Sequence, residues 1–154
     1  FRDKDYEVLF VTGNTYYEKV KKTHVPSNVK IVPFVYEMPS LMKVTDLMIT
    51  RAGATTMSEI MVLGVPSIFI PSPYVTNNHQ YKNAMDLVNK NAALILEEKD
   101  LTRNNLITMI DIILKNEKEY DEIKNNLKDL GIKDSSSRIY EVLKELIMDD
   151  NKFY

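Results

Sequence analysis

Short runs of apolar and β-branched residues alternate with amphipathic stretches through most of the chain. The expected strands run from Tyr6 to Val11, Val29 to Val35, Asp46 to Thr50, Ser67 to Ile70 and Ala92 to Leu96. The helices expected between them run from Thr15 to Lys22, Pro39 to Val44, Thr56 to Leu63 and Tyr81 to Lys90. Strands that alternate with helices of this length favour a parallel sheet with helices on both faces. The sequence therefore predicts an α/β, three-layer fold with about five parallel strands.

The last third of the chain is predicted to be helical. Apolar residues recur every three or four positions from Leu106 to Ile113, from Tyr120 to Leu130 and from Ile139 to Ile147. That spacing is typical of amphipathic helices. Gly131 is expected to end the second helix and Ser135 to begin the third. A length of 154 residues suits one domain, so residues 1–154 are predicted to form one, with the helical tail over about residues 102–150.

Composition excludes several classes of function. The chain has no cysteine, which excludes disulfides, thiolate zinc sites and cysteine nucleophiles. Its formal charge of −2 lacks the basic excess of a protein that neutralises nucleic-acid phosphates, so no nucleic-acid partner is expected. Two histidines without metal-ligand spacing predict no metal site, and no G-x-G-x-x-G or P-loop motif supports a dinucleotide cofactor. No apolar run approaches the ~20 residues that cross a bilayer.

The loop after the third expected strand, from Thr50 to Glu59, is the first candidate site. In open α/β sheets ligands bind at the carboxyl ends of the strands. Small residues here allow close approach to the backbone, and the start of the next helix offers free N–H groups to a phosphate or diphosphate. Thr56-x-x-Glu59 also has the spacing of a capping box, in which Glu59 would only bond its own helix. The alternative is that Glu59 accepts hydrogen bonds from sugar hydroxyls.

Two further loops lie at the same edge of the predicted sheet. The segment from Pro71 to Ala84 concentrates amides, hydroxyls and an imidazole, which suit recognition of sugar hydroxyls. A polar turn that caps the next helix is an equally good interpretation of Asn77, Asn78 and His79. The segment from Phe34 to Pro39 either presents its backbone to a planar base or simply connects a strand to a helix.

Taken together, these loops resemble one family. The resemblance rests on Phe34–Pro39, the run Asp46–Ile60 with Arg-Ala-Gly-Ala-Thr-Thr, the segment Gly64–Pro73 and the run Asn-His-Gln-x-x-Asn-Ala at residues 78–84. These residues are similar to the C-terminal domain of the MurG family. Members of that family transfer N-acetylglucosamine from its UDP ester to undecaprenyl-pyrophosphoryl-MurNAc-pentapeptide in peptidoglycan synthesis. The similarity extends over essentially the whole chain and is densest from Val29 to Asp100.

The family has the GT-B architecture, in which two Rossmann-like domains face each other across a cleft and the C-terminal one holds the UDP-sugar donor. The resemblance therefore implies a Rossmann-like fold and a donor site. Val35 would meet the uracil through its backbone. Ala54–Thr56 would lie under the diphosphate, and Glu59 would accept from the ribose hydroxyls.

The same resemblance assigns the sugar end of the site. Gln80 would contact the hydroxyls of N-acetylglucosamine, with His79 and Asn83 in support. Arg51 and Gly53 would shape the turn before the helix. No residue of this chain is expected to be catalytic. The implied reaction is an inverting transfer with no obligatory metal and no cofactor, in which the acceptor hydroxyl attacks the anomeric carbon and UDP leaves.

The chain departs from the family pattern in two respects. It contains no Gly-Gly-Ser loop, so we expect its sheet to lack a first strand and its donor site to lack one wall. The family's N-terminal domain, which binds the lipid-linked MurNAc-pentapeptide, is also absent from the sequence. We therefore expect this chain alone to be soluble, inactive in transfer and at best a weak binder of UDP-sugars. The helical tail would pack on the N-terminal domain and expose apolar surface without it.

The resemblance also implies a location and leaves two alternatives. A complete protein of this family would act at the cytoplasmic face of the bacterial cell membrane as a peripheral enzyme. One alternative is the donor domain of another GT-B enzyme that uses a UDP-sugar, such as a diacylglycerol glucosyltransferase. The other is a binding module without catalytic function that kept the fold. Comparing the binding of UDP-glucose with that of UDP-N-acetylglucosamine would test the first alternative. Unchanged nucleotide binding in a Glu59→Ala variant would favour the second.

Overall fold

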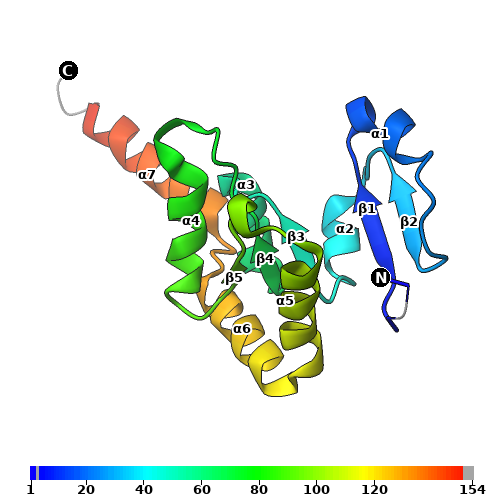
Figure 1. The fold of residues 1–154 in the computed structure, drawn as a ribbon. Helices are drawn as coiled ribbons and strands as arrows, with labels where there is room; N and C mark the ends of the chain where they lie inside the picture. Colours follow the sequence, from blue (N-terminus) through cyan, green and yellow to red (C-terminus); the bar gives the residue numbers. More distant parts are fainter. Residues whose placement is uncertain (3, 151–154) are drawn as a thin grey trace. The chain divides into compact units, whose positions relative to one another are not determined.

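The computed structural model describes residues 1–2 and 4–150, and it contains two compact units. The first unit is Phe1–Leu41 and the second is Met42–Tyr154. Each unit has its own parallel sheet, with two strands in the first and three in the second among the described residues (Figure 1). The α/β class and the parallel strands are confirmed, whereas the prediction that residues 1–154 form one domain stays a prediction.

The first unit is a β-α-β arrangement. Strand β1 (Val8–Val11) pairs in parallel with β2 (Val29–Val32), and helix α1 (Asn14–Val20) lies between them in the sequence. The strand was expected to run from Val29 to Val35, but it ends at Val32. The next residue, Pro33, has no N–H to donate to a neighbouring strand. Helix α2 (Met38–Met42) follows and runs across the boundary between the units in the sequence.

The sheet of the second unit has the order β3-β4-β5, and both pairings are parallel. Its strands are β3 (Met48–Thr50), β4 (Ser67–Phe69) and β5 (Leu94–Ile95). The central strand β4 is fully buried, with its three side chains 0% exposed. A strand buried on both faces needs continuous apolar character, which explains why Ile68 and Phe69 are adjacent. The only polar side chain in this strand, Ser67, donates to the carbonyl of Val65.

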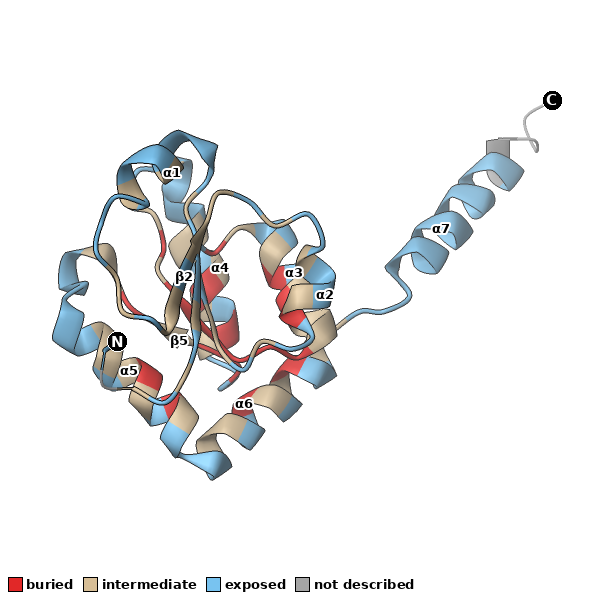
Figure 2. Cartoon of the chain, turned by 90° about the vertical axis from the view of Figure 1, so that its right-hand side faces the viewer, coloured by how far each residue is buried: buried red, intermediate tan, exposed pale blue. Residues whose placement is uncertain are grey.

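The helical elements described in the second unit are α3 (Ala54–Leu63), η1 (Thr76–Asn78), α4 (His79–Val88), η2 (Glu98–Asp100), α5 (Arg103–Lys115), α6 (Glu117–Leu130) and α7 (Ser135–Asp150). Helix α6 contacts both α3 and α5, and α4 contacts β5. Among these helical elements, α3, α4, α5 and α6 carry buried positions, coloured red in Figure 2. The side chains with the largest buried volumes on these helices include Ile60, Ile113 and Leu127.

The ends of several helices follow the predicted chemistry. Helix α3 ends at Gly64, whose φ of 67° and ψ of 44° place it in the left-handed region that favours glycine. The three predicted tail helices are present, and α7 begins at Ser135 as expected. Every described side chain from Ile132 to Met148 is exposed, including the apolar side of α7 (Figure 2). The amphipathic pattern of α7 therefore has no packing partner within the described residues.

Candidate functional site

The turn between β3 and α3 presents free backbone amides. Helix α3 begins at Ala54, two residues earlier than predicted, and Gly53 is its N-cap. The first helical hydrogen bond runs from the Met57 N–H to the Gly53 carbonyl at 3.0 Å. The N–H groups of Ala54, Thr55 and Thr56 precede that bond, and no side chain caps them. Such amides, together with the positive end of the helix dipole, form a site for an anion.

The capping-box interpretation of Thr56-x-x-Glu59 is wrong. Because Gly53 is the N-cap, Thr56 is the third residue of α3 and Glu59 the sixth, so their spacing no longer matches a cap. The Glu59 side chain is half-buried, and no hydrogen bond or ion pair involves it within the described part of the chain. Glu59 lies one turn after Thr55 and Thr56 on the same side of the helix. Its carboxylate is therefore available to a ligand beside the free amides.

Gly53 leaves space in front of these amides. A Cβ built at Gly53 would meet no atom within 4 Å, and its φ of −73° is one that any residue adopts. Neither packing nor backbone strain therefore requires a glycine here. The absence of a side chain instead keeps the approach to the helix N-terminus open. The neighbouring Ala54 and Thr55 are exposed, which fits a surface that can receive a ligand.

Arg51 connects the carboxyl ends of three strands. It follows the last residue of β3, and its Nη1 donates to the carbonyl of Ile70, just after β4, at 3.0 Å. The same Nη1 lies 2.7 Å from Oε2 of Glu98, which opens η2 after β5. The Arg51 side chain therefore contacts the segments that follow β4 and β5. The expected role of Arg51 in shaping the turn before α3 stays a prediction. Glu98 was not expected as part of the site.

The segment after β4 places three predicted site residues on the first turns of α4. Helix α4 begins at His79, two residues earlier than predicted, so His79, Gln80 and Asn83 are all helical. Oε1 of Gln80 accepts from the Ser72 N–H at 2.9 Å, and Nδ2 of Asn83 donates to the carbonyl of Ala52 at 3.3 Å. Asn83 thus joins α4 to the turn before α3. The two candidate loops of this unit lie side by side at one edge of the sheet.

The polar-turn interpretation of this loop also has structural support. Asn77 and Asn78 have φ values of 54° and 52°, a left-handed conformation that asparagine tolerates. Nδ1 of His79 lies 2.9 Å from the carbonyl oxygen of Thr76, so the His79 ring contacts a residue of the same turn. No side-chain hydrogen bond caps α4, so these residues form a turn without capping the helix.

Val35 belongs to the first unit and is described there alone. It lies between β2 and α2, half-buried, beside the exposed rings of Phe34 and Tyr36. Those two rings meet edge to face, with centroids 5.1 Å apart. Neither the N–H nor the carbonyl of Val35 forms a hydrogen bond in the part of the chain that the structure describes. Its backbone is therefore available to a ligand, as the expected contact with a base requires.

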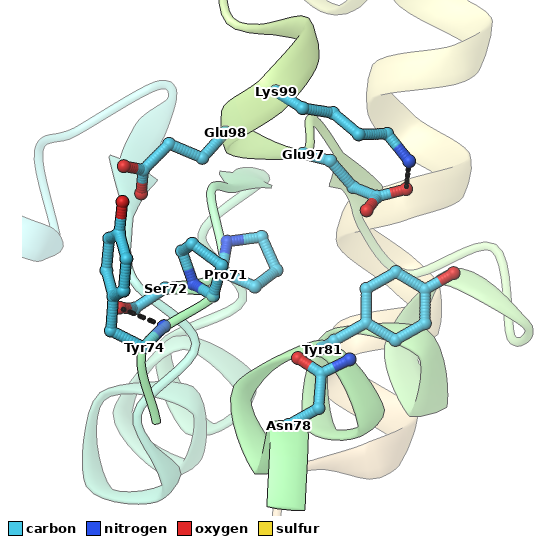
Figure 3. A pocket seen from close by; sticks show the side chains of 9 residues that line it. Pro71, Ser72, Tyr74, Asn78, Tyr81, Glu97, Glu98 and Lys99 are labelled. Atoms are coloured by element: carbon cyan, nitrogen blue, oxygen red, sulfur yellow. Dashed lines mark hydrogen bonds and ion pairs between the residues drawn. The ribbon is translucent and has the colours of Figure 1, made fainter. Parts of the chain in front are cut away.

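A cavity of about 350 Å³ opens beside the β4–α4 segment. Figure 3 shows its walls, which come from the segment after β4, from α4 and from the residues after β5. They are Pro71, Ser72, Pro73, Tyr74, Asn78, Tyr81, Glu97, Glu98 and Lys99. Residues 97–99 follow β5 at the same edge as the other loops, and of these only Glu98 contacts a predicted site residue, Arg51, within the described part of the chain. Nζ of Lys99 pairs with Oε1 of Glu97 at 3.2 Å.

Among the described residues, no group of three or more His, Cys, Asp or Glu side chains is arranged to hold a metal ion. None of the described helices combines the length and apolar character that a membrane span needs.

The parallel strands, the helices between them and the loops at the carboxyl ends of the strands define an α/β domain of the Rossmann-like class. Residues 1–139 match the glycosyltransferase family 28 C-terminal domain, and the chain belongs to that family. This finding confirms the sequence resemblance.

Two relatives carry the same functional name. The chain is 48% identical over 151 residues to the UDP-N-acetylglucosamine--N-acetylmuramyl-(pentapeptide) pyrophosphoryl-undecaprenol N-acetylglucosamine transferase of Bacillus cytotoxicus. It is 49% identical over 151 residues to transferase 1 of that name in Bacillus cereus. In both comparisons the alignment covers 96% of this chain and 42% of the relative. The chain therefore spans less than half the length of these relatives.

A solved structure agrees on the fold. The crystal structure of Acinetobacter baumannii MurG superposes with a TM-score of 0.81 and 24% sequence identity. The match covers 90% of this chain and 41% of that one. At this identity the likeness establishes the Rossmann-like fold of a MurG C-terminal domain and nothing about ligands.

Proposed function

We propose that this chain binds UDP-N-acetylglucosamine as the donor half of an inverting N-acetylglucosaminyltransferase of peptidoglycan synthesis. The relatives' names specify both this donor sugar and a lipid-linked MurNAc-pentapeptide acceptor. In the proposed arrangement the acceptor binds to an N-terminal domain that lies outside this sequence. The complete enzyme would work at the cytoplasmic face of the bacterial membrane, attached peripherally.

The observation that carries the proposal is the uncapped N-terminus of α3 with Glu59 on the same side. The amides of Ala54, Thr55 and Thr56 lack intrahelical acceptors and have no capping side chain. A diphosphate bound there would receive hydrogen bonds and the favourable end of the helix dipole. Glu59 would accept from the two ribose hydroxyls, since a carboxylate offers acceptors only. Both groups of the donor would then contact one turn of one helix.

The same amides explain how the chain would assist the reaction. The acceptor hydroxyl forms a bond to the anomeric carbon as the bond from that carbon to the diphosphate oxygen breaks. Negative charge grows on the diphosphate as UDP leaves. Fixed N–H donors that face this charge stabilise it more in the transition state than in the ground state. The proton of the acceptor hydroxyl would go to a base on the N-terminal domain, because we assign no catalytic residue to this chain.

Calorimetric titration with UDP and UDP-N-acetylglucosamine tests the proposal. Hydrogen bonds to a charged group contribute about 1.5–3 kcal/mol. Replacing Glu59 with alanine should therefore weaken UDP binding by roughly 10- to 150-fold. Glu122→Gln removes a charge from α6, away from this edge, and is the matched control: it should bind UDP as the wild type does. Unchanged affinity in Glu59→Ala would instead support a binding module of another kind.

The sugar is tested separately. UDP-N-acetylglucosamine should bind more tightly than UDP-glucose if Gln80, His79 and Asn83 recognise the sugar as proposed. The reverse preference would favour the alternative of a diacylglycerol glucosyltransferase. We expect either affinity to be weaker than that of a complete enzyme, since this sequence has no Gly-Gly-Ser loop.

A further inference from the structure

Glu98 reaches the site through Arg51. The two residues are 47 positions apart in the sequence, yet Oε2 of Glu98 lies 2.7 Å from Nη1 of Arg51. Figure 3 shows Glu98 directed toward the Tyr74 side of the cavity, away from the neighbouring pair of Glu97 and Lys99. The side chains of consecutive glutamates therefore serve different partners. Of these two glutamates, Glu98 alone is bonded to a residue of the β3–α3 turn in the described part of the chain.

The contact between Arg51 and Glu98 links the segments that follow the two outer strands of this sheet, β3 and β5. Arg51 follows β3, its second acceptor is the Ile70 carbonyl after β4, and Glu98 follows β5. Because the strands lie in the order β3-β4-β5, one guanidinium spans the ends of all three. Arginine has several rotatable bonds, so an exposed one is fixed only where its N–H groups have well-placed acceptors. Without Glu98, the Ile70 carbonyl would be its single remaining acceptor within the described residues.

The turn that offers the amides is held from two directions. Arg51 lies two residues before Gly53, the N-cap of α3. Ala52, between them, is 0% exposed and accepts from Asn83 on α4. Glu98 therefore fixes one side of the turn through Arg51, and Asn83 fixes the other through the backbone. The direction of the amides at the start of α3 depends on both contacts.

We propose that Glu98 is a positioning residue for the donor site, and this inference rests on the proposed function of that site. Glu98 holds the Arg51 side chain along the strand ends, and so keeps the β3–α3 turn in the conformation that presents its amides to the diphosphate. Glu98 itself does not touch the donor.

The experiment compares Glu98→Gln with Glu97→Gln in the full chain. Each removes one carboxylate charge from adjacent positions, but Glu97 pairs with Lys99 and not with Arg51. The Arg51 and Glu98 side chains are 51% and 34% exposed, so the ion pair is a modest one. We expect Glu98→Gln to weaken UDP binding about two- to five-fold, and Glu97→Gln to leave it unchanged.

Amide hydrogen exchange at Met57 gives a readout that needs no ligand. The Met57 N–H forms the first hydrogen bond of α3, so its exchange reports how firmly the turn is held. Glu98→Gln should exchange about two- to five-fold faster at this amide, and adding Arg51→Gln should increase the rate little further, because both variants break the same contact. The Glu97→Gln control should exchange like the wild type.

The outcomes separate the two proposals. Suppose that the wild-type chain fails to bind UDP, while exchange at Met57 becomes faster in Glu98→Gln and not in Glu97→Gln. The proposed donor function is then wrong, and the role of Glu98 in holding the turn is supported. Unchanged Met57 exchange in Glu98→Gln overturns the positioning role. Tighter UDP binding in Glu98→Gln also overturns it, because that result would mean that Glu98 restrains Arg51 from binding the diphosphate.

Discussion

Gly131, the C-cap of α6, is the position where adding one methyl group should do most damage to the helix that carries the site. A Cβ at Gly131 would lie 2.7 Å from the carbonyl oxygen of Met61 and 3.0 Å from Cα of Val62, both in α3. The φ of Gly131 is −72°, so backbone strain does not explain the glycine. The close approach of two backbones does, since α3 and the end of α6 meet there without side chains between them.

The cost of Gly131→Ala follows from what the new methyl group meets. The clashing atoms belong to a helix backbone, which cannot rotate away as a flexible side chain can. Relief requires a shift of α3 or of the end of α6, and overpacking of this kind costs about 1–3 kcal/mol. For a chain of this size, each kcal/mol lowers the melting temperature by roughly 2–4 °C. We therefore expect Gly131→Ala to melt roughly 2–12 °C below the wild type.

Urea denaturation followed by circular dichroism measures this loss, with Gly53→Ala as the matched control. Both variants exchange glycine for alanine next to α3, but a Cβ at Gly53 meets no atom within 4 Å. Alanine is a poorer N-cap than glycine, so the control should lose less than about 1 kcal/mol. If Gly131→Ala unfolds at the same urea concentration as Gly53→Ala, then α6 does not approach α3 as closely as the structure indicates.

Two further predictions concern α3. Gly53→Ser should place a hydroxyl where it can cap the amides of residues 55 and 56, raising the free energy of unfolding by about 0.2–0.5 kcal/mol while it weakens UDP binding; higher stability with unchanged or tighter UDP binding would show that the diphosphate binds elsewhere. Ile60→Ala empties a site that is 0% exposed and should cost about 2–5 kcal/mol in urea denaturation, whereas Ile139→Ala, at 61% exposed on α7, should cost less than about 0.5 kcal/mol. Equal losses for the two isoleucines would mean that α7 is packed in solution.

Local sequence patterns predicted the alternation of elements because it depends on neighbours in the chain. Apolar periodicity placed all three tail helices, and Gly64 and Gly131 ended helices as expected. Two starts were predicted late, at Thr56 and Tyr81. In α3 the N-cap is a glycine, which gives a weaker signal than the threonine three residues on. In α4 the N-cap is Asn78 in a left-handed conformation, which sequence spacing does not reveal.

Contacts between distant segments could not be predicted in the same way. The separation of five parallel strands into sheets of two and three depends on pairing between strands, which single-strand patterns do not encode. Between Arg51 and Glu98 in the sequence lie α3, β4, η1, α4 and β5. Nothing in the local sequence around Glu98 distinguishes it from Glu97 beside it. The roles of the site residues came from the family resemblance, and they stay predictions until donor binding is measured.

The N-caps of the helices in the second unit also support the proposal that an anion binds at the start of α3. Helices α5 and α6 begin with Thr102 and Asn116, whose side chains accept from the backbone N–H groups of Asn105 and Glu119 at 3.1 and 3.3 Å. Helix α3 begins with a glycine and leaves the equivalent amides without a side-chain acceptor. Compared with glycine, a serine at that position typically adds about 0.2–0.5 kcal/mol of stability, and its side chain would fit the open space. A capping side chain at position 53 would compete with an anion for the same N–H groups. It would therefore increase the stability of the helix and weaken the binding of the donor.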